Sequence, residues 1–475
     1  MNDLRTRTTT FCITLAAILL LTTICNAADR PNIILMMSDD QGWGDVGYNG
    51  HKELKTPHLD QMAKEGITFN RFYSANAMCS PTRGSVYTGR HPYRYGITFA
   101  MKGMLEPNEI CITTVLKKAG YTTGHFGKWH MGTLSKKRPD QNRWGAFAKN
   151  PQRYYCPPWE RDVDVSFVTE SKVPTWDPMI NPGKFKRGVD IPYPEPGDAK
   201  PYGNEFFTGP DMKATTNLRG DDSRVIMDRA IPFIEGAVKE KKPFLAVIWF
   251  HTPRSPVVAG PPHRNPYKDL SLEKQHYYGC LTAMDEQIGR LRASLNDLGI
   301  ADNTMVTFCS DNGPARQGSP REVGTAAHLR GRKLTLLEGG IRVPGLLVWP
   351  KRFPQPKTIN TPVVTTDYFP TILAVLDIPL PDDRPYDGTN ILPLIEDPKR
   401  KRDKGIGFLH AGTEVWMKDQ YKLIGKETDY KLYDIDTDPG EKTNLANELP
   451  EVYATLKKEL DAWTPGVFAD LKSIK

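Results

Sequence analysis

Several features that define whole classes of protein are missing from this chain of 475 residues. No two of its cysteines have the spacing of a zinc knuckle, which argues against a cysteine zinc site. No arm rich in lysine and arginine and interleaved with aromatic residues is present, so nucleic-acid binding has no support. No repeat of fixed period occurs, and no apolar stretch of membrane-spanning length follows the N-terminal region. These absences favour a globular protein with neither nucleic acid nor membrane as a partner.

The overall composition is that of an ordinary globular protein. Charged residues make up 25% of the chain and apolar residues 39%. A chain of this length can bury a large core, so we expect two domains or one domain with a substantial subdomain. The formal net charge of +7 is a modest excess, which suits an anionic substrate but equally serves solubility.

The N-terminus has the pattern of an export signal. Arg5 and Arg7 precede an apolar run at 11–24, and small residues follow up to Ala28. This order of basic, apolar and small-residue segments predicts a signal peptide over residues 1–28. A signal anchor is the alternative, although the run is short for a membrane span. We therefore expect an exported protein, periplasmic or secreted, with no membrane segment after cleavage.

Removal of that segment leaves five cysteines. Cys79 lies in a motif of its own, and the other four are enough for two disulfides in an oxidising compartment. The sequence does not reveal how they would pair. The four are Cys111, Cys156, Cys280 and Cys309.

The most distinctive stretch is 78–90, Met-Cys-Ser-Pro-Thr-Arg-Gly-Ser-Val-Tyr-Thr-Gly-Arg. Pro81 suits the first turn of a helix, which would place Cys79 at the helix N-terminus. Unpaired backbone N–H groups favour an anion there. Arg83, one turn further on, can point to the same place. The alternative is a buried structural cysteine beside an unrelated surface arginine.

Four short apolar segments have the pattern of buried strands, and each is followed by polar residues. Because helical segments alternate with them, we expect an α/β fold with a mostly parallel central sheet flanked by helices. Ligands of such sheets bind at the carboxyl ends of the strands, so these polar residues should meet at one edge. A solvated turn is the alternative for the Asp-Asp pair. The segments are 31–38 with Asp39 and Asp40, 121–126 with Lys128 and His130, 243–250 with His251, and 304–309 with Asp311 and Asn312.

The other segments indicate the domain organisation. Apolar stripes predict amphipathic helices at 221–240 and 271–299. The segment 139–211 lacks periodicity and is rich in proline and aromatic residues, which favours an active-site wall that selects the substrate; a surface excursion is the alternative. Short strands and a helix near the C-terminus predict a subdomain with a small antiparallel sheet. We therefore expect a catalytic domain at 29–395 and a C-terminal subdomain at 396–475.

Two motifs resemble those of a known family. The pattern Cys-x-Pro-x-Arg at 79–83, followed by Thr-Gly-Arg at 88–90, resembles the signature of the formylglycine-dependent sulfatases, which are arylsulfatase-like members of the alkaline phosphatase superfamily. The string Gly-Lys-Trp-His-Met-Gly at 127–132 resembles a second motif of that family, with Met131 in place of Leu. The likeness extends over nearly the whole mature chain. It implies an alkaline-phosphatase-like fold and the hydrolysis of sulfate esters.

The resemblance also assigns roles to side chains. It implies that Cys79 is oxidised to formylglycine by a formylglycine-generating or anaerobic sulfatase-maturing enzyme and that the hydrated aldehyde is the nucleophile. Arg83 would orient the hydrate, and Asp311 could accept a proton from it. Lys128 would stabilise the developing charge, and His130 would assist the release of sulfate. The residues implied to bind sulfate and protonate the leaving oxygen are His251 and Lys333.

A divalent metal is implied as well. Carboxylate and amide oxygens form a hard site that suits Ca²⁺ or Mg²⁺. We expect Ca²⁺ because the family usually has it, with Mg²⁺ as the open alternative. Such an ion would offset the charge of the sulfate and act as a Lewis acid. The implied ligands are Asp39, Asp40, Cys79, Asp311 and Asn312.

Taken together, these features predict an exported sulfatase that hydrolyses sulfate monoesters of a sulfated carbohydrate. One departure is Arg254, at a position where many members of the family carry histidine, so substrate contacts cannot be transferred residue by residue. The alternatives are a phosphatase, phosphodiesterase or phosphonate hydrolase of the same superfamily, and a non-catalytic binder of sulfated glycans with an unmodified Cys79. The first group usually has a serine or threonine nucleophile and many histidine metal ligands.

Overall fold

The computed structural model describes residues 30–100, 102–137, 149–183, 200–315 and 323–474. The predicted signal peptide lies outside the described residues, as do parts of the segment 139–211. Among the helices of the described ranges, none is long and apolar enough to cross a membrane.

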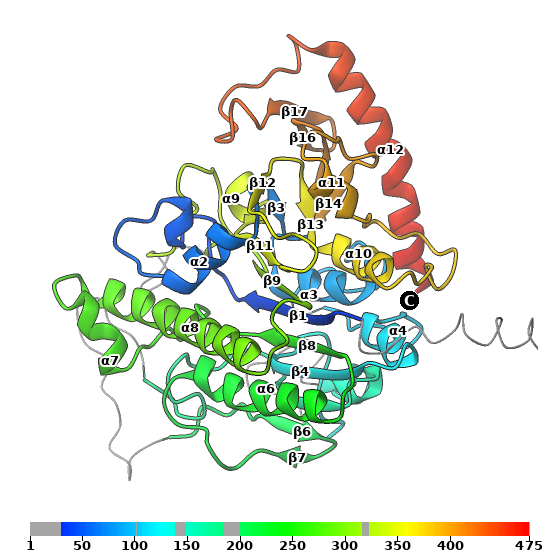
Figure 1. Cartoon of the computed structure of the whole chain (residues 1–475). Helices are drawn as coiled ribbons and strands as arrows, with labels where there is room; N and C mark the ends of the chain where they lie inside the picture. Colours follow the sequence, from blue (N-terminus) through cyan, green and yellow to red (C-terminus); the bar gives the residue numbers. More distant parts are fainter. Residues whose placement is uncertain (1–29, 101, 138–148, 184–199, 316–322, 475) are drawn as a thin grey trace, which may run out of the picture.

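A ten-stranded sheet forms the centre of the molecule (Figure 1). Its strands are β1 (Asn32–Ser38), β2 (Ile67–Phe69), β4 (Thr122–Lys128), β5 (Val165–Thr169), β6 (Phe207–Gly209), β7 (Met212–Lys213), β8 (Phe244–Trp249), β9 (Thr304–Ser310), β11 (Gly345–Val348) and β12 (Lys357–Ile359). They lie in the order β12-β2-β11-β9-β1-β8-β4-β5-β6-β7. The five strands from β9 to β5 are parallel, and β11 is antiparallel to β9. The predicted mostly parallel sheet is therefore confirmed.

Helices cover both faces of this sheet (Figure 1). They include α2 (Pro57–Glu65), α3 (Cys79–Thr88), α4 (Ile112–Lys118), α6 (Asp222–Lys239), α8 (Leu272–Asp297) and α10 (Tyr368–Val375). Ile33, Leu35 and Met37 of β1 pack in one apolar cluster with α3, α4 and α10. Ile34 and Met36 pack in another with α2, α6 and α8. Because successive side chains of a strand point to opposite faces, a strand covered on both sides must be apolar throughout, as β1 is.

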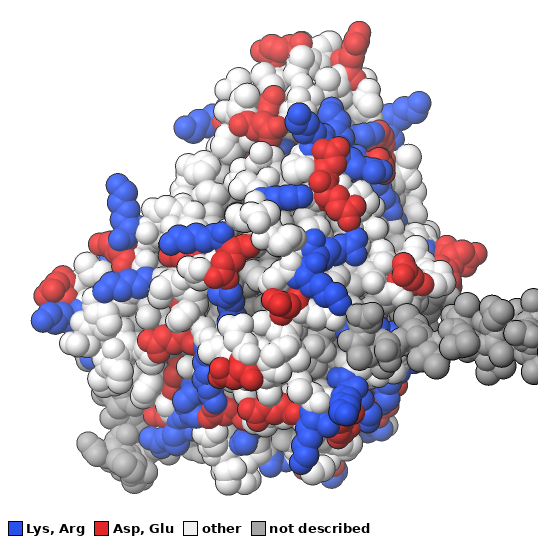
Figure 2. Space-filling view, viewed as in Figure 1, with Lys and Arg blue, Asp and Glu red and all other residues white. Residues whose placement is uncertain are grey.

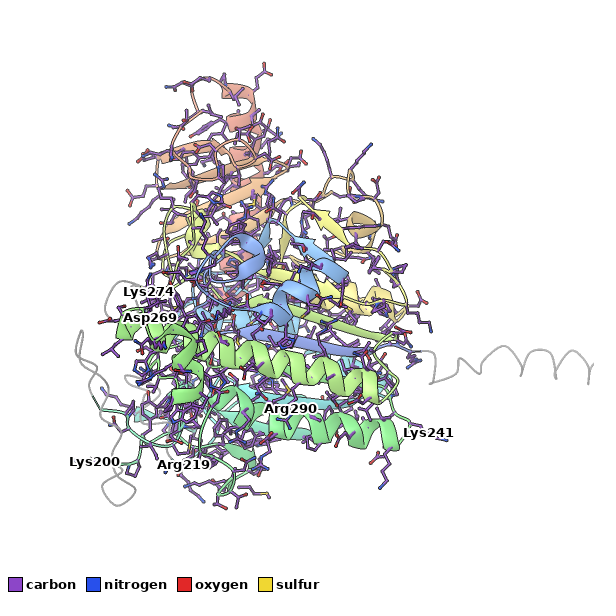
Figure 3. The ribbon with its side chains drawn as sticks, turned by 60° about the vertical axis from the view of Figure 1, so that its left-hand side comes forward. Lys200, Arg219, Lys241, Asp269, Lys274 and Arg290 are labelled. Atoms are coloured by element: carbon purple, nitrogen blue, oxygen red, sulfur yellow. The ribbon has the colours of Figure 1, made fainter. Side chains whose placement is uncertain are left out.

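The two longest helices of the sheet layer confirm the predicted amphipathic segments. Ser271 caps α8, its side chain accepting a hydrogen bond from the backbone N–H of Lys274. The predicted stripe of α8 is buried from Leu281 to Leu295. Figure 3 shows α8 beside α6, and on the outer surface Arg290 of α8 pairs with Asp228 of α6 at 2.5 Å.

A small second sheet and several short helices connect these layers. The second sheet has the order β10-β3-β13. These connecting elements are η2 (Gly47–Asn49), β3 (Phe72–Tyr73), η3 (Pro158–Arg161), α7 (Pro261–Arg264), η4 (Asn265–Tyr267), α9 (Glu338–Ile341), β10 (Arg342–Val343), β13 (Val363–Val364), η5 (Thr365–Asp367) and α11 (Leu392–Glu396).

The C-terminal residues form an antiparallel sheet of four strands with one long helix, as predicted. Their elements are β14 (Ile406–His410), β15 (Thr413–Lys418), β16 (Tyr421–Lys426), β17 (Asp429–Asp434) and α12 (Pro450–Ser473). The helix extends to Ser473, and Val467 in its last part is completely buried. The domain boundary at 395/396 stays a prediction.

The expectation of two disulfides is wrong. The cysteines of the described ranges are free and buried. Cys111, Cys156 and Cys309 belong to the apolar cluster on one face of the sheet, whereas Cys280 belongs to the cluster on the opposite face. Because the sheet separates Cys280 from the other three cysteines, two bridges cannot form among these four residues.

The segment 139–211 is also less irregular than expected. Its residues Val165–Thr169 form β5, which extends the central sheet in parallel with β4. Phe167 and Val168 are buried on opposite faces of the sheet. Part of this segment is therefore a core strand, and the active-site wall stays a prediction for the residues outside β5.

Charged side chains of both signs are interspersed on the face shown in Figure 2. On that face basic and acidic residues neighbour one another over most elements. This mixture agrees with the modest net charge of +7.

A buried ion cluster joins the C-terminal sheet to the body of the molecule. Lys422 Nζ lies 2.9 Å from Glu338 Oε1 and 3.0 Å from Glu441 Oε1. All three residues are completely buried. Burial alone would raise the pKa of Glu338, but Lys422 and Arg342 lower it below its usual value. Lys422 and Arg342 thus supply the positive charge beside two carboxylates that water cannot reach.

We predict that Lys422→Met lowers the free energy of unfolding by about 3–5 kcal/mol, because removal of one partner leaves buried charges uncompensated. Unfolding in urea, followed by tryptophan fluorescence, measures this loss. Lys457→Met is the matched control, since Lys457 pairs with Asp461 at 2.5 Å on an exposed helix face and such pairs contribute about 0.5 kcal/mol. Equal effects of the two substitutions would contradict the prediction.

Candidate active site

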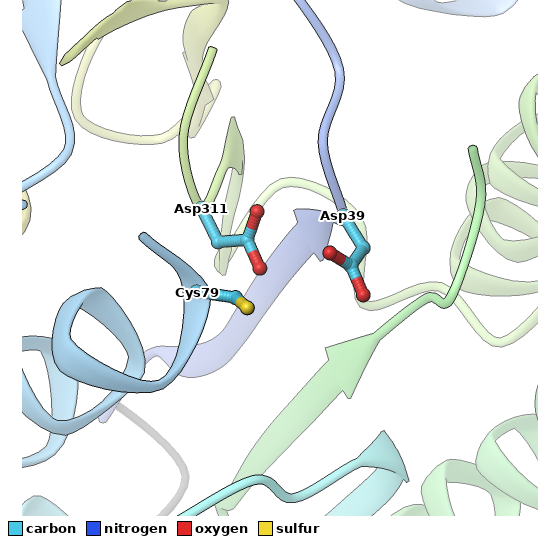
Figure 4. Close-up of side chains that lie close together, drawn as sticks. All are labelled: Asp39, Cys79 and Asp311. Atoms are coloured by element: carbon cyan, nitrogen blue, oxygen red, sulfur yellow. The ribbon is translucent and has the colours of Figure 1, made fainter. Parts of the chain in front are cut away.

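The loops that follow β1 and β9 meet the start of α3 at the carboxyl edge of the sheet (Figure 4). Ser38 of β1 lies opposite Ser310 of β9 in parallel register, so the next residues, Asp39 and Asp311, leave the sheet side by side. Cys79 is the first residue of α3. One side-chain atom of each of Asp39, Cys79 and Asp311 lies within 4.8 Å of the other two, and all three residues are buried. The fold thus brings together three predicted positions that are distant in the sequence.

Arg83 connects the two carboxylates of this group. It lies one turn after Cys79 in α3, and its side chain is completely buried. Its Nε and Nη2 donate to Asp311 Oδ2 at 3.1 and 2.6 Å, and Nη2 is 3.8 Å from Asp39 Oδ2. The guanidinium also lies over the ring of Trp249, 5.1 Å from its centroid. Arg83 is therefore a buried cation that pairs with both carboxylates, and the alternative of an unrelated surface arginine is wrong.

The end of β4 brings Lys128 and His130 to the same edge. Lys128 Nζ is 2.5 Å from Asp39 Oδ2, and this side chain is 1% exposed. His130 is buried and has a left-handed backbone, with φ of 63°. Its carbonyl accepts a hydrogen bond from the hydroxyl of Ser80, the neighbour of Cys79 in α3. Lys128 and His130, which were predicted to share this site, thus lie beside the start of α3 and come from the end of β4.

Asp40 lies at the centre of a second set of contacts. Its Oδ1 accepts hydrogen bonds from Lys333 Nζ and, at 2.8 Å, from Asn312 Nδ2. Its Oδ2 accepts one from Arg254 Nη1 at 3.0 Å. Lys333 Nζ also lies 3.7 Å from Cys79 Sγ. Because Asp40 is only 1% exposed, the solvated turn considered for the Asp-Asp pair is wrong.

These charges alter the acidity of the carboxyl groups. Burial raises the pKa of Asp311 to about 6, and the Asp39 carboxylate adds to the shift. Burial also opposes ionisation of Asp39 and Asp40, but nearby cations outweigh it. Lys128 lowers the pKa of Asp39, and Lys333 lowers the pKa of Asp40. Two of the carboxyl groups are thus held ionised, whereas Asp311 can take up a proton in mildly acidic solution.

Two buried oxygens of the group have no hydrogen-bond donor within the described part of the chain. They are Asp39 Oδ1 and Asn312 Oδ1. A buried acceptor without a partner costs free energy, and a bound cation would remove that cost. The atoms around this place that could bind a cation are mainly carboxylate and amide oxygens, which hard divalent cations prefer as ligands. The predicted ligand residues therefore fit a divalent cation.

His251 follows β8 and is completely buried. Its Nδ1 lies 2.8 Å from Asp222 Oδ2, and its Nε2 lies 2.7 Å from Thr169 Oγ1. Both ring nitrogens therefore contact protein groups, and a contact with sulfate requires the Thr169 bond to be exchanged for one to the substrate. Its role as a proton donor stays a prediction.

The sequence pattern did not reveal Asp222 and Thr169 as partners of His251. Asp222 begins α6 directly after the cap residue Asp221, and this acidic pair was the available signal. Thr169 ends β5, which lay hidden in a segment without recognisable periodicity. A histidine fixed by two such groups has a defined orientation, so both are positioning residues.

Known proteins resemble the chain over most of its length. A model of the sulfatase family matches residues 31–378. The chain belongs to the sulfatase family. A second model, described as the C-terminal part of N-sulphoglucosamine sulphohydrolase, matches residues 332–464 of this sulfatase. As a member of the family, the sulfatase is an enzyme of the sulfuric ester hydrolase class, as the motifs predicted.

Individual relatives agree with this assignment. The sulfatase is 30% identical over 400 residues to N-acetylgalactosamine-6-sulfatase of Homo sapiens, covering 82% of this chain and 70% of that protein. It is 32% identical over 394 residues to arylsulfatase G of Rattus norvegicus, covering 77% and 68%. The chain thus spans about two thirds of the length of these relatives. A crystal structure of Ps i-CgsB in complex with k-i-k-neocarrahexaose superposes with a TM-score of 0.74 at 25% identity, covering 92% of this chain and 93% of that one.

We predict that Ca²⁺ stabilises the sulfatase and that Asp311→Asn removes most of this effect. A ligand bound only by the folded state adds about 2.7 kcal/mol at a concentration of 100 times Kd. Thermal unfolding with Ca²⁺, with Mg²⁺ and with a chelator measures the shift. Asp461→Asn is the control, because the Asp461 side chain is 58% exposed and belongs to α12, which contributes no residue to the predicted ligand set. A melting temperature that is indifferent to both ions would contradict the prediction.

We also predict that the cation binds more weakly as the pH falls through about 6, the pKa of Asp311. A ligand must be deprotonated to bind a metal, so below this pH a proton competes with the cation and is released on binding. Calorimetric titration of Ca²⁺ at pH 5 and pH 7, in buffers of different ionisation enthalpy, measures affinity and proton release together. An affinity for Ca²⁺ that rises as the pH falls would contradict this prediction.

Proposed function

We propose that the chain is an exported sulfatase that hydrolyses sulfate monoesters of a sulfated carbohydrate, through a formylglycine formed from Cys79 and a divalent cation. In this proposal residues 1–28 direct export, 29–395 carry catalysis and 396–475 form a subdomain. The observation that carries it is the convergence of Cys79 with three buried carboxylates and four cationic side chains. The carboxylates belong to Asp39, Asp40 and Asp311, and the cations to Arg83, Lys128, Arg254 and Lys333.

The position of residue 79 suits a nucleophile that attacks an anion. It occupies the first turn of α3, where free backbone N–H groups and the helix dipole favour negative charge. Formylglycine hydrate would supply two hydroxyl groups on one carbon, one to attack sulfur and one to release sulfate. Because Cys79 is 2% exposed, we expect the formylglycine-generating or anaerobic sulfatase-maturing enzyme to act before the chain has folded.

The surrounding charges would stabilise the transferring group. Lys128 and Lys333 approach the carboxylate pair from different elements, so each can neutralise a sulfate oxygen in a site where fixed charges act strongly. Arg83 fixes Asp311 through two hydrogen bonds to one oxygen. Asp311, which lies beside Cys79, is the candidate acceptor for the proton of the nucleophile.

The two histidines are the candidates for the remaining proton transfers. His251 is oriented by Asp222, which keeps a carboxylate 2.8 Å from Nδ1 and leaves Nε2 for exchange with a leaving oxygen. The carbonyl of His130 accepts a hydrogen bond from Ser80 of α3, and the side chain of His130 would assist release of the sulfate.

A divalent cation held by Asp39, Asp40, Asp311, Asn312 and residue 79 would act as a Lewis acid on the sulfate. The two buried oxygens without donors support a cation at this place. The hard donor set favours Ca²⁺ or Mg²⁺ over softer metals.

The names of the relatives support a sulfated carbohydrate as substrate. N-acetylgalactosamine-6-sulfatase and N-sulphoglucosamine sulphohydrolase are named after sulfated amino sugars. The structure of Ps i-CgsB contains an oligosaccharide, k-i-k-neocarrahexaose. The proposal therefore commits to a sugar sulfate as the natural substrate, and 4-nitrophenyl sulfate serves only as a reporter of sulfate-ester cleavage.

We predict that peptide mass spectrometry finds formylglycine, which is lighter than cysteine, at position 79 of protein made together with a maturing enzyme. We further predict that Cys79→Ala lowers kcat/KM for 4-nitrophenyl sulfate by about 10⁴-fold or more, as loss of a nucleophile does. Cys280→Ala is the matched control, because this thiol is equally buried but lies on the other face of the sheet.

The alternatives make opposite predictions. A phosphatase, phosphodiesterase or phosphonate hydrolase would turn over 4-nitrophenyl phosphate faster than the sulfate. A non-catalytic binder of sulfated glycans would keep an unmodified Cys79 and turn over neither ester. Either result contradicts the proposed function.

A further inference from the structure

A cavity of about 440 Å³ lies where the body of the molecule meets the loop that follows β17. This volume is within the range of about 300–1,000 Å³ that is usual for pockets that bind small molecules. Among the described residues that line it, none belongs to the set proposed for catalysis or for cation binding. Trp43 forms one wall. The polar side chains of the lining are Asn70, Arg71, His328, Arg342, Asn360 and Asp436.

The cavity and the segment that carries Cys79 lie at opposite ends of the C-terminal sheet. Asn76, three residues before Cys79, donates to the carbonyl of Leu409 at 2.8 Å, next to the turn between β14 and β15. Asp434, the last residue of β17, pairs with Tyr421 at the other end of these strands. Because β15, β16 and β17 have six residues each and a strand rises about 3.4 Å per residue, the two ends are well separated. The cavity is therefore distinct from the candidate active site.

Arg71 has a buried donor in the wall of this cavity. Its side chain is 4% exposed. Its Nη1 donates to Asp436 Oδ1 at 2.9 Å, and its Nε donates to the hydroxyl of Tyr73 at 3.5 Å. Its Nη2 has no hydrogen-bond acceptor among the described residues. A buried donor of a charged group costs free energy when it lacks an acceptor, and an anion in the cavity would remove that cost.

The other walls are fixed by contacts among themselves. Arg342 Nε donates to the backbone carbonyl of Asn70 at 2.8 Å, and its Nη2 donates to Asn70 Oδ1 at 3.2 Å. The guanidinium of Arg342 lies over the ring of Trp43, 5.4 Å from its centroid. Asn70 Nδ2 in turn donates to Asn360 Oδ1 at 3.0 Å. A cavity with walls held in this way needs little reordering when a ligand binds.

The charge at Arg71 favours an anion over a neutral ligand. Asp436 is its partner on one side, but the Asp436 side chain is 56% exposed, so water screens the charge of this carboxylate more than that of the buried guanidinium. A guanidinium donates to a carboxylate or a sulfate through charge-assisted hydrogen bonds, which are stronger than those to neutral groups.

We propose that this cavity is a second binding site of the protein, which takes an oxyanion, a carboxylate or a sulfate group, on Nη2 of Arg71. Free sulfate and an acidic sugar share this chemistry, and the volume of the cavity is large enough for the sugar as well as for the ion. The inference goes beyond the proposed function, because it does not depend on the chemistry at Cys79.

The test follows Trp43 by ¹⁹F NMR in protein labelled with 5-fluorotryptophan, since Trp43 lines the cavity and is one of nine tryptophans. Trp43→Phe assigns its resonance. The Cys79→Ala chain, which prevents turnover, is titrated at constant ionic strength with sodium sulfate, glucuronate and glucose 6-sulfate, and with glucose as the neutral control. We expect a saturable shift with at least one anion and none with glucose. Tighter binding of the acidic sugars assigns the anion to a sugar, and tighter binding of sulfate assigns it to the free ion.

Three variants test the role of Arg71. Arg71→Gln should weaken binding by about 10-fold or more, as expected when a hydrogen bond between charged groups is lost. Asp436→Asn should tighten binding by about 5-fold, because it removes an exposed carboxylate that pairs with Arg71. A gain in affinity cannot result from a damaged fold. Arg384→Gln is the matched control, because Arg384 pairs with Asp382 at 2.6 Å outside the cavity, and it should leave binding unchanged.

Four results would overturn the inference. The Trp43 resonance fails to respond to any of the anions, or it responds equally to glucose. The response keeps its affinity in Arg71→Gln, which would mean that it reports binding at another place. Binding weakens in Asp436→Asn. None of these results involves turnover, so each leaves the proposed function untouched. Absence of formylglycine or of sulfate hydrolysis in the wild type refutes the proposed function and leaves this inference standing.

Discussion

The burial of three carboxylates in one place is the constraint on which the rest of the site depends. Asp39, Asp40 and Asp311 are each at most 1% exposed. Like charges repel strongly in a medium of low permittivity, so a folded chain can hold them together only with cations in contact. Arg83 and Lys128 come from α3 and β4, on different parts of the sheet. The site therefore forms only when these elements are assembled. The ion pairs that stabilise the fold at this place are also the ones that position the charges of the site.

Parallel strand pairing makes this concentration of charge possible. In neighbouring parallel strands the chain leaves the sheet at the same edge, so Asp39 and Asp311 follow directly from paired residues. The apolar run of β1 below them packs on both faces and fixes where the polar residues begin. The start of α3 then adds a helix N-terminus at the same edge. Apolar packing thus offsets an arrangement of charges that is unfavourable by itself.

The part of the site that lies in continuous motifs could be predicted from the sequence. Apolar strands end at recognisable places and the motif at Cys79 is specific, so the sequence alone predicts that Asp39, Asp311 and Cys79 share one site. Thr169, one of the two partners of His251, could not be found, because Val165–Thr169 is a short strand between irregular segments. The disulfide expectation failed for a related reason. A count of cysteines carries no information about which face of the sheet each occupies, and Cys280 lies opposite the others.

Depth also determines which charges of such a site can vary. Lys128 is the closest cation to Asp39, at 2.5 Å, and its loss would leave a buried carboxylate with weaker compensation from Arg83 at 3.8 Å. Asp40 has two cationic partners, so it keeps Lys333 when Arg254 is replaced and keeps Arg254 when Lys333 is replaced. The buried cations are therefore required for the fold as well as for the site, because each lies against a carboxylate that water does not reach.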